Sequence, residues 1–325
     1  MRAVQRIAFA SVLAAGTALA ALPCLAQTTG NFPAKPIRLV VPGAGQLDTL
    51  ARMMGSKMSE SFGQPVVVEN VAGAGGILAA NRVAKATPDG HTVLLAASGF
   101  AISAALHSSL PYDPRKDFVG VSQIVIPTTV LVVSPTLGVR SVKELIAVAK
   151  AKPGKIIFGS TGPGSGPHLL GEKFRLGSDI NVVSVGLKSG QTLIETMTGR
   201  IDYCFLPLGS VLPFLSDGKV VALAVATPRR SPVLPDVPTI AETIPGFAKA
   251  MGSFGLLAPA RTPRHVVNQI GKEVARILSL PGVNEWMRSD GLVPAPTTPE
   301  EYDRILHAQI EGFAELIRIA GIPKR

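Results

Sequence analysis

Short runs of β-branched and aliphatic residues alternate with longer helix-like segments, and this alternation limits the fold more than any other feature. Strand-like runs at residues 37–41, 65–69 and 92–96 enclose a periodic segment at 48–62 and a second one that follows small residues at 73–76. An order of strand, helix, strand, helix and strand favours crossover connections and parallel pairing. We therefore expect an α/β protein whose N-terminal part forms a doubly wound sheet.

The same alternation restarts further along the chain, which predicts a second sheet. Further strands are expected at residues 119–126, 130–134, 156–158, 182–185, 202–205, 220–226 and 254–258, and further helices at 141–150, 167–175, 191–199, 264–280, 282–290 and 299–319. Two βα units of similar size, followed by a helical tail, predict two lobes with a doubly wound sheet in each. The chain is expected to cross between the lobes near residues 123–127 and 251–255. The first lobe would then comprise residues 27–124 and 254–325, and the second lobe residues 125–253.

The first 26 residues have the features of a secretory signal peptide. Arg2 and Arg6 form a basic start, residues 7–22 are apolar or small, and Ala26 ends a cleavage site of small residues. The alternatives are an uncleaved membrane anchor, for which the apolar stretch is short, and a lipoprotein box at Cys24. We expect cleavage after Ala26 and a soluble protein in the periplasm.

Charge and cysteine content limit the partners of the mature chain. The whole chain has a net charge of +10, yet no basic cluster is longer than Arg229 and Arg230, and aromatic residues make up only 5%. A dispersed positive charge favours an anionic small-molecule ligand over nucleic acid. Only Cys204 follows the expected cleavage site, so we expect no intramolecular disulfide and a core position for this thiol.

Small residues follow several expected strands, at the positions where α/β sheets bind ligands. Glycine-containing turns occur at residues 42–46, 73–76, 98–99, 159–166 and 186–190. Ligands bind outside the carboxyl ends of such strands, where helix N-termini present unpaired N–H groups to a carboxylate or phosphate. Each turn taken alone also fits an ordinary tight connection. Their occurrence in both lobes favours an anion-binding cleft.

The turn after the first strand also resembles a dinucleotide-binding fingerprint. Gly43 and Gly45 precede a helix, and Glu69 ends the next strand. The third glycine of that fingerprint is replaced by Asp48, whose charge suits a close contact between helix and strand poorly. We expect Asp48 to cap the N-terminus of the helix instead.

Residues for catalysis or metal binding form no recognisable pattern. The sequence contains no Gly-x-Ser-x-Gly motif, and its five histidines lack the spacing of metal ligands. His168 stands at the start of an expected helix, where it can either donate to a bound anion or cap the helix. We expect no enzyme activity, no metal and no cofactor. The alternative functions are an exported hydrolase, a nucleotide-dependent oxidoreductase and a ligand sensor of a two-component system.

Eight segments, taken in order, resemble the Bug family of substrate-binding proteins from tripartite tricarboxylate transporters. They read FPAKPIRLVVP, DTLAR, QPVVVENVAGAGG, ATPDGHTVLLAA, LPYDPRKDFVGVSQI, FGSTGPGSGPHLLGEKF, GRIDYCF and SPVLPDVPTIAE. The resemblance implies a two-lobed periplasmic binding protein of the Venus-flytrap type (type II-like), whose cleft holds a small carboxylate. It also implies delivery of this ligand to a two-component membrane permease. We expect the protein to be a monomer.

The resemblance assigns ligand-binding positions in both lobes. They are Gly43, Ala44, Gly45, Gln46, Asp48, Ala74, Gly75, Ser98 and Gly99 in the first lobe, and Ser160, Thr161, Gly162, Ser165, His168, Gly186, Leu187 and Phe205 in the second. The chain departs from the family pattern in two turns. Residues 42–45 read Pro-Gly-Ala-Gly instead of Pro-Pro-Gly-Gly, and residues 185–189 read Val-Gly-Leu-Lys-Ser instead of Val-Pro-Tyr-Lys-Gly. The second change removes a hydroxyl and an aromatic ring, so the resemblance implies the class of the ligand but not its identity.

Overall fold

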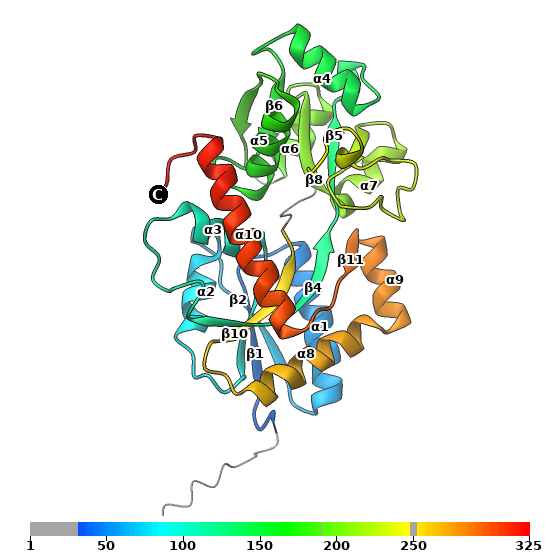
Figure 1. The fold of residues 1–325 in the computed structure, drawn as a ribbon. Helices are drawn as coiled ribbons and strands as arrows, with labels where there is room; N and C mark the ends of the chain where they lie inside the picture. The colour runs from blue at the N-terminus through cyan, green and yellow to red at the C-terminus, as the bar shows by residue number, and fades with distance from the viewer. Residues whose placement is uncertain (1–31, 189, 248–251) are drawn as a thin grey trace, which may run out of the picture.

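The computed structural model describes residues 32–188, 190–247 and 252–325 and consists of two lobes, each an open β-sheet flanked by helices (Figure 1). This arrangement confirms the two-lobed α/β fold expected from the alternation of strands and helices. The expected signal peptide, residues 1–26, lies outside the described residues.

The first lobe is built on a six-stranded sheet of order β11-β4-β10-β3-β1-β2. Its strands are β1 (Ile37–Val41), β2 (Val66–Asn70), β3 (Thr92–Ala96), β4 (Phe118–Pro127), β10 (Phe254–Pro259) and β11 (Leu292–Pro294). Strands β2, β1 and β3 are parallel, as expected, whereas β10 is antiparallel to both β3 and β4. The helices of this lobe are α1 (Gln46–Phe62), α2 (Ile77–Ala84), α3 (Ser98–Leu106), α8 (Arg264–Leu278), α9 (Pro281–Ser289) and α10 (Pro299–Ile319).

The second lobe is built on a five-stranded sheet of order β7-β6-β8-β5-β9. Its strands are β5 (Thr129–Val133), β6 (Ile157–Ser160), β7 (Val183–Gly186), β8 (Tyr203–Pro207) and β9 (Val221–Val225). Its helices are α4 (Val142–Ala151), α5 (Gly166–Ser178), α6 (Gln191–Met197) and α7 (Leu208–Ser216). Strands β7, β6 and β8 are parallel, and β5 is antiparallel to both β8 and β9, so this sheet is mixed like the first.

The chain passes from the first sheet to the second between β4 and β5, which only Thr128 separates. The Thr128 N–H donates to the carbonyl of Gly291 (2.8 Å), and the Thr128 carbonyl accepts from the N–H of Leu208 (2.9 Å). Both backbone groups of this linking residue are therefore paired. Strand β4 pairs with β11 as far as Pro127, so the first sheet extends past residue 124. The division into lobes by residue number stays a prediction.

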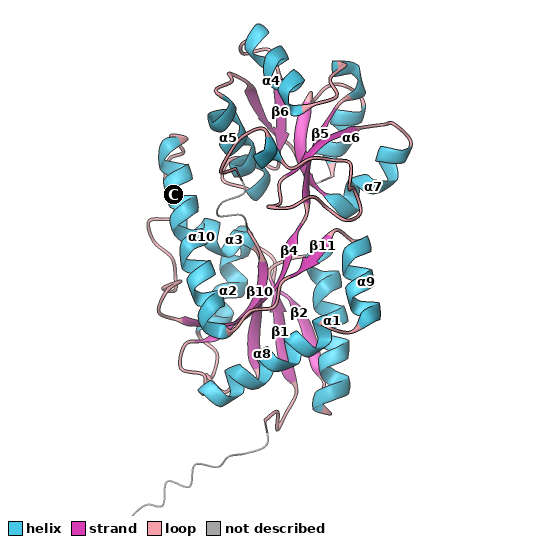
Figure 2. Ribbon diagram, turned by 45° about the vertical axis from the view of Figure 1, so that its right-hand side comes forward, coloured by secondary structure: helices cyan, strands magenta, loops and turns pink. Residues whose placement is uncertain are grey.

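Helix α10 runs along the first lobe and reaches the second (Figures 1 and 2). Its residues Leu306, Phe313 and Leu316 belong to one apolar cluster with Phe100 of α3 and Leu169 of α5. Leu169 comes from the second lobe and is fully buried. Burial of apolar surface therefore joins the two lobes on the side of α5.

Among the described residues, two α-helices and one β-strand were not predicted from the sequence patterns. Helix α3 carries no charge and buries Phe100, Ile102 and Leu106, so it lacks the polar face from which a helix is recognised. Helix α7 contains Pro213, a residue that normally ends a helix. Strand β11 has three residues, which are too few to show an alternating pattern.

Gly171 allows helix α5 to approach strand β6 closely. A Cβ atom at this position would overlap the ring of Phe158, which is fully buried in the core of the second lobe. The position of α5, and with it the position of the turn that precedes α5, depends on this absent side chain.

We predict that Gly171→Ala lowers the free energy of unfolding by about 1–3 kcal/mol, because overpacking forces core side chains out of their preferred rotamers. Gly282→Ala is the matched control, since Gly282 also lies in a helix but an added Cβ meets no atom within 4 Å. The control should be neutral or stabilising by up to about 1 kcal/mol. Urea denaturation measures both effects, and equal stabilities of the two variants would contradict the steric role of Gly171.

Candidate functional site

The turn after β1 lies at the edge of the first sheet where α1 begins. Gly45 has φ 88° and ψ −150°, a conformation that glycine adopts far more readily than other residues, and Gln46 is the first residue of the helix. Asp48 is therefore the third helical residue and not the N-cap, which corrects the expectation from the sequence. The positive φ of Gly45 turns the chain into the helix earlier than a cap at Asp48 would.

The Asp48 carboxylate instead braces this turn. Asn70, at the end of β2, donates from Nδ2 to the carbonyl of Gly43 (3.0 Å) and to Oδ1 of Asp48 (2.9 Å). Arg52 donates from Nε to Oδ2 of Asp48 (2.9 Å). These hydrogen bonds, first that from Arg52 and then that from Asn70, lower the pKa of Asp48 below its usual value. An ionised side chain and its donors thus fix the backbone around Gly43 and Ala44.

The turn after β2 contains four successive residues with positive φ. The angles are 130° at Gly73, 47° at Ala74, 65° at Gly75 and 97° at Gly76. Glycine adopts such angles readily, whereas a non-glycine residue there costs about 1–3 kcal/mol, so Ala74 is held by its surroundings. The turn lies against the start of α3, because a Cβ on Gly99 would be 3.0 Å from the carbonyl oxygen of Gly75.

Ser98 and Gly99 follow β3, as expected, and are the first two residues of α3. The chain before β10 also comes close to this point, since a Cβ on Gly252 would overlap the Ser98 side chain. Helices α1 and α3 follow the adjacent strands β1 and β3, so their N-termini lie at the same edge of the sheet. Both present unpaired N–H groups and a positive dipole end there.

In the second lobe, the turn after β6 is held by its own side chains. The Ser160 hydroxyl, which is buried, accepts a hydrogen bond from the N–H of Gly162 (3.2 Å). The Ser165 hydroxyl caps α5 by accepting from the N–H of His168 (3.3 Å). Nδ1 of His168 in turn accepts from the N–H of Gly164 (3.4 Å). His168 therefore closes the turn, while Thr161 is exposed.

The turn after β7 contacts the turn after β6. The N–H of Leu187 donates to the carbonyl of Ser160 (2.8 Å), and a Cβ on Gly186 would be 3.1 Å from Cα of Gly162. Close approach of the two backbones thus brings both second-lobe turns together.

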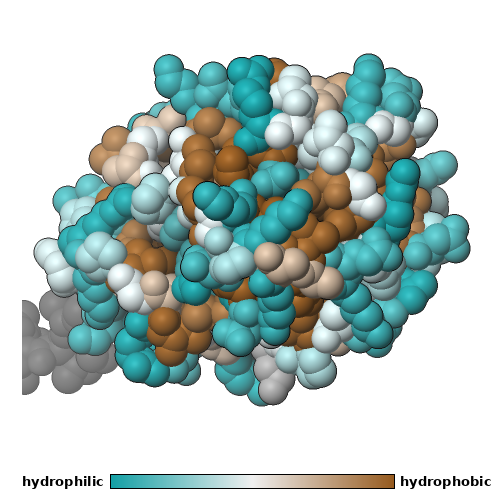
Figure 3. All heavy atoms as spheres, turned by 90° about the horizontal axis from the view of Figure 1, so that it is seen from above, coloured by the Kyte–Doolittle hydropathy of each residue, from teal (hydrophilic) through white to brown (hydrophobic). Residues whose placement is uncertain are grey.

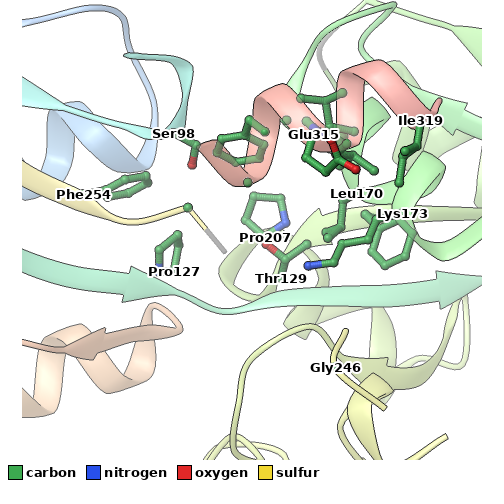
Figure 4. Close-up of a pocket in the computed structure, with 18 of the residues that line it drawn as sticks. Ser98, Pro127, Thr129, Leu170, Lys173, Pro207, Gly246, Phe254, Glu315 and Ile319 are labelled. Carbon is green, nitrogen blue, oxygen red and sulfur yellow. The ribbon is translucent and has the colours of Figure 1, made fainter. Parts of the chain in front are cut away.

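A cavity of about 500 Å³ lies between the lobes (Figure 4). Its apolar lining comes from both lobes and includes Pro127, Leu169, Leu170, Phe205, Phe254, Phe313, Leu316 and Ile319, and its polar lining consists of Gln46, Ser98, Thr129, Lys173 and Glu315. Of the residues expected from the sequence, Gln46, Ser98 and Phe205 line this cavity. The others belong to the turns described above, to the first turn of α1 or to that of α5, and do not line it.

The two charged side chains of the lining differ in their surroundings. Lys173 of α5 is half-buried, and its Nζ lies 5.3 Å from the centre of the Phe247 ring. Burial lowers the pKa of Lys173 to about 8. Glu315 of α10 is more exposed and forms an ion pair with Arg318 (2.7 Å). The second-lobe side of the cavity therefore carries a positive charge in an apolar setting.

Comparison with known proteins identifies the family. A family model described as the tripartite tricarboxylate transporter family receptor matches residues 50–322. The chain belongs to this receptor family. Its sequence is 34% identical to BugT of Bordetella pertussis (strain Tohama I) over 313 residues, which cover 94% of either chain. The expected membership of the Bug family is thus confirmed.

Solved structures of similar proteins share the fold over their whole length. Rpa4515 of R. palustris with adipate is 32% identical, with a TM-score of 0.80 over 90% of this chain and 100% of that one. MatC from Rhodopseudomonas palustris with bound malate is 30% identical, with a TM-score of 0.75 over 88% and 100%. The periplasmic binding protein BugD is 29% identical, with a TM-score of 0.76 over 90% and 100%. Receptors of this family are solute-binding proteins.

Sequence reasoning missed Lys173 and the contribution of α10 to the cavity of this receptor. Gly166, Leu170 and Lys173 recur at intervals of three and four residues, so they share one face of α5. That spacing is visible in the sequence. The contact of this face with α10 is not visible, because α10 lies much further along the chain.

The sequence predicted a core position for the thiol of Cys204. Cys204 is fully buried and burial raises the pKa of its thiol to about 12, which confirms a core position.

Among the described residues, no group of three or more His, Cys, Asp or Glu side chains is placed to hold a metal ion. No helix in the described ranges is long and apolar enough to cross a membrane. Seen from the second-lobe end, hydrophilic and apolar residues are interspersed on the surface (Figure 3).

We predict that acidification destabilises the receptor through His168. Burial lowers the pKa of His168 below its usual 6.5, and the charge of Glu172 opposes this shift only in part. The unfolded chain therefore binds a proton at this ring at a higher pH than the folded chain does. Stability from the neutral ring is fully present above pH 6.5 and is lost as the pH falls through the lower, folded pKa.

The test compares unfolding free energies at about pH 7.5 and about pH 5.5 for the parent, His168→Gln and His265→Gln. His168→Gln should reduce the loss of stability on acidification, because glutamine has no titrating ring. His265 is exposed, so its variant should behave as the parent does. An unchanged pH dependence in His168→Gln would contradict a buried neutral imidazole.

Proposed function

We propose that this receptor captures a small carboxylate in the cavity between its lobes and delivers it to a membrane permease of the tripartite tricarboxylate type. The observation that carries the proposal is the cavity itself. It is lined from both lobes, so a ligand inside it contacts both and favours their closed arrangement. The adipate and malate named for two similar structures support a carboxylate as the ligand.

In this proposal, the backbone of the first lobe holds the anion. Gln46 and Ser98 line the cavity, and they are the first residues of α1 and α3. Two helix N-termini together offer N–H donors and a positive field to a carboxylate. The turns at residues 43–48, 73–76 and 98–99 form the first wall of the closed site. The turns at 160–168 and 186–187, with Phe205, form the second.

We further propose that the mature receptor is a periplasmic monomer without enzyme activity, released by cleavage after Ala26. Membership of a transporter receptor family and similarity to the periplasmic binding protein BugD support this view. N-terminal sequencing of the exported protein, light scattering of the purified protein and mass spectrometry of incubated ligands test its three parts. A chain that begins at Met1, a dimer or a chemically altered ligand would each contradict one of them.

Binding should stabilise the receptor by mass action. A ligand that binds only the folded state contributes about 2.7 kcal/mol at a concentration of one hundred times its dissociation constant. We therefore expect a rise in melting temperature with at least one member of a screen of mono-, di- and tricarboxylates, and a smaller radius of gyration in X-ray scattering with that ligand. A screen in which no carboxylate raises the melting temperature would refute the proposed function.

Gly45→Val should abolish measurable binding. A branched side chain cannot adopt φ 88° and ψ −150°, so the turn that leads into α1 must rearrange. Gly63→Val is the matched control: Gly63 also has a positive φ (64°) and an open surrounding, but it lies at the opposite end of α1. Both variants should lose stability, and calorimetry with the ligand from the screen should show that only Gly45→Val loses affinity. Equal affinities would place the site elsewhere.

A further inference from the structure

Lys173 is the one positively charged residue among the described residues that line the cavity. It projects from the same face of α5 as Gly166 and Leu170. Figure 4 shows its side chain running from the helix towards Thr129, with the amine directed into the pocket. Within the described lining, the positive charge thus comes from the second lobe.

The surroundings of Lys173 favour an anionic partner in the cavity. Its amine lies over the ring of Phe247 at 5.3 Å, and the residue as a whole is half-buried. Burial lowers its pKa to about 8, which means that the charged form is poorly solvated there. A carboxylate beside the amine would favour the charged form through a charge-assisted hydrogen bond.

The acidic residue of the lining, Glu315, forms an ion pair with an arginine of its own helix. Glu315 is bound by Arg318 of its own helix, with both Nε and Nη2 of the arginine donating to the carboxylate (2.8 and 2.7 Å). Both side chains of this pair are well exposed. The carboxylate of Glu315, which lines the cavity, is therefore paired with Arg318.

Apart from its few polar residues, the lining of the cavity is apolar. It includes the rings of Phe205, Phe254 and Phe313 and the side chains of Leu169 and Leu170. A ligand hydroxyl placed against such walls loses its water without gaining a hydrogen bond, which is unfavourable. A methylene chain or an aromatic ring gains by the same burial.

We infer that the ligand is a dicarboxylate with an apolar spacer, and that Lys173 pairs with one of its carboxylates while the first-lobe turns at Gln46 and Ser98 hold the other. The inference rests on the proposed function and makes it more specific. Lys173 then selects for the second carboxylate, and the apolar walls select against hydroxylated chains.

The first test uses matched pairs of acids that differ by one carboxylate: adipate with hexanoate, and terephthalate with 4-methylbenzoate. Calorimetry should show that the parent binds at least one dicarboxylate about tenfold or more tightly than its partner acid, since a charge-assisted hydrogen bond is lost. In Lys173→Met this preference should disappear, because the methionine fills the same space without a charge. Lys173→Arg should keep the preference.

Lys143→Met is the control, since Lys143 is an exposed residue of α4 and its loss removes the same net charge. It should bind both acids as the parent does. A parent without preference in either pair, or a Lys173→Met variant that keeps the parent's ratio, would overturn the inference. The circular dichroism of each variant must match that of the parent, and Lys173→Arg preserves the test if Lys173→Met does not fold.

The second test concerns the spacer. Galactarate has the six-carbon chain of adipate with four added hydroxyls, and we expect it to bind about tenfold or more weakly. Equal or tighter binding of galactarate would overturn the apolar spacer. If other carboxylates bind while these preferences fail, the inference is wrong and the proposed function stands. If no carboxylate binds, the proposed function fails with it.

Discussion

The burial of Leu169 among first-lobe side chains holds the arrangement on which the cavity depends. Leu169 belongs to α5 of the second lobe, yet it is fully buried in a cluster with Phe100 of α3 and Phe313 of α10. Leu169 and Phe313 also line the cavity, so the contact that joins the lobes is one of its walls. Apolar burial is non-directional, and it can hold the lobes together while they rotate by small amounts.

The two lobes offer different chemistry to an anion. The first lobe presents Gln46 and Ser98, the first residues of α1 and α3, to the cavity, and the positive φ of Gly45 sets the turn that leads into α1. Backbone N–H groups can donate to any carboxylate, and most side-chain substitutions leave these donors in place. The second lobe presents the side chain of Lys173, which can change without disturbing the sheet. In the site that we propose, general affinity therefore comes from the first lobe and discrimination between ligands from the second.

The sequence predicted the sheets better than it predicted the cavity, for physical reasons. Strands β1, β2 and β3 were recognised because amphipathic helices separate them, and the glycine turns were recognised because positive φ angles need glycine. Helix α3 was missed because it is apolar on all sides. Asp48 was wrongly predicted to be the N-cap of α1, because the residue types of the turn do not reveal the backbone angles of Gly45, at which the helix begins. Lys173 was missed because its exposure to the cavity depends on where α10 lies.

The apolar wall of the cavity is also the side on which the lobes are tied together. Nη2 of Arg325 donates to the carbonyl of Pro163 (3.0 Å), and the carbonyl of Arg325 accepts from the N–H of Ser108 (2.8 Å). The C-terminal end thus bridges a first-lobe segment and the second-lobe turn, next to the contact between α5 and α10. These polar contacts add to the apolar contact between α5 and α10, so both kinds of interaction tie the lobes together on this side of the cavity. The position of α5, which carries Lys173, is therefore fixed by contacts with the first lobe as well as by its own sheet.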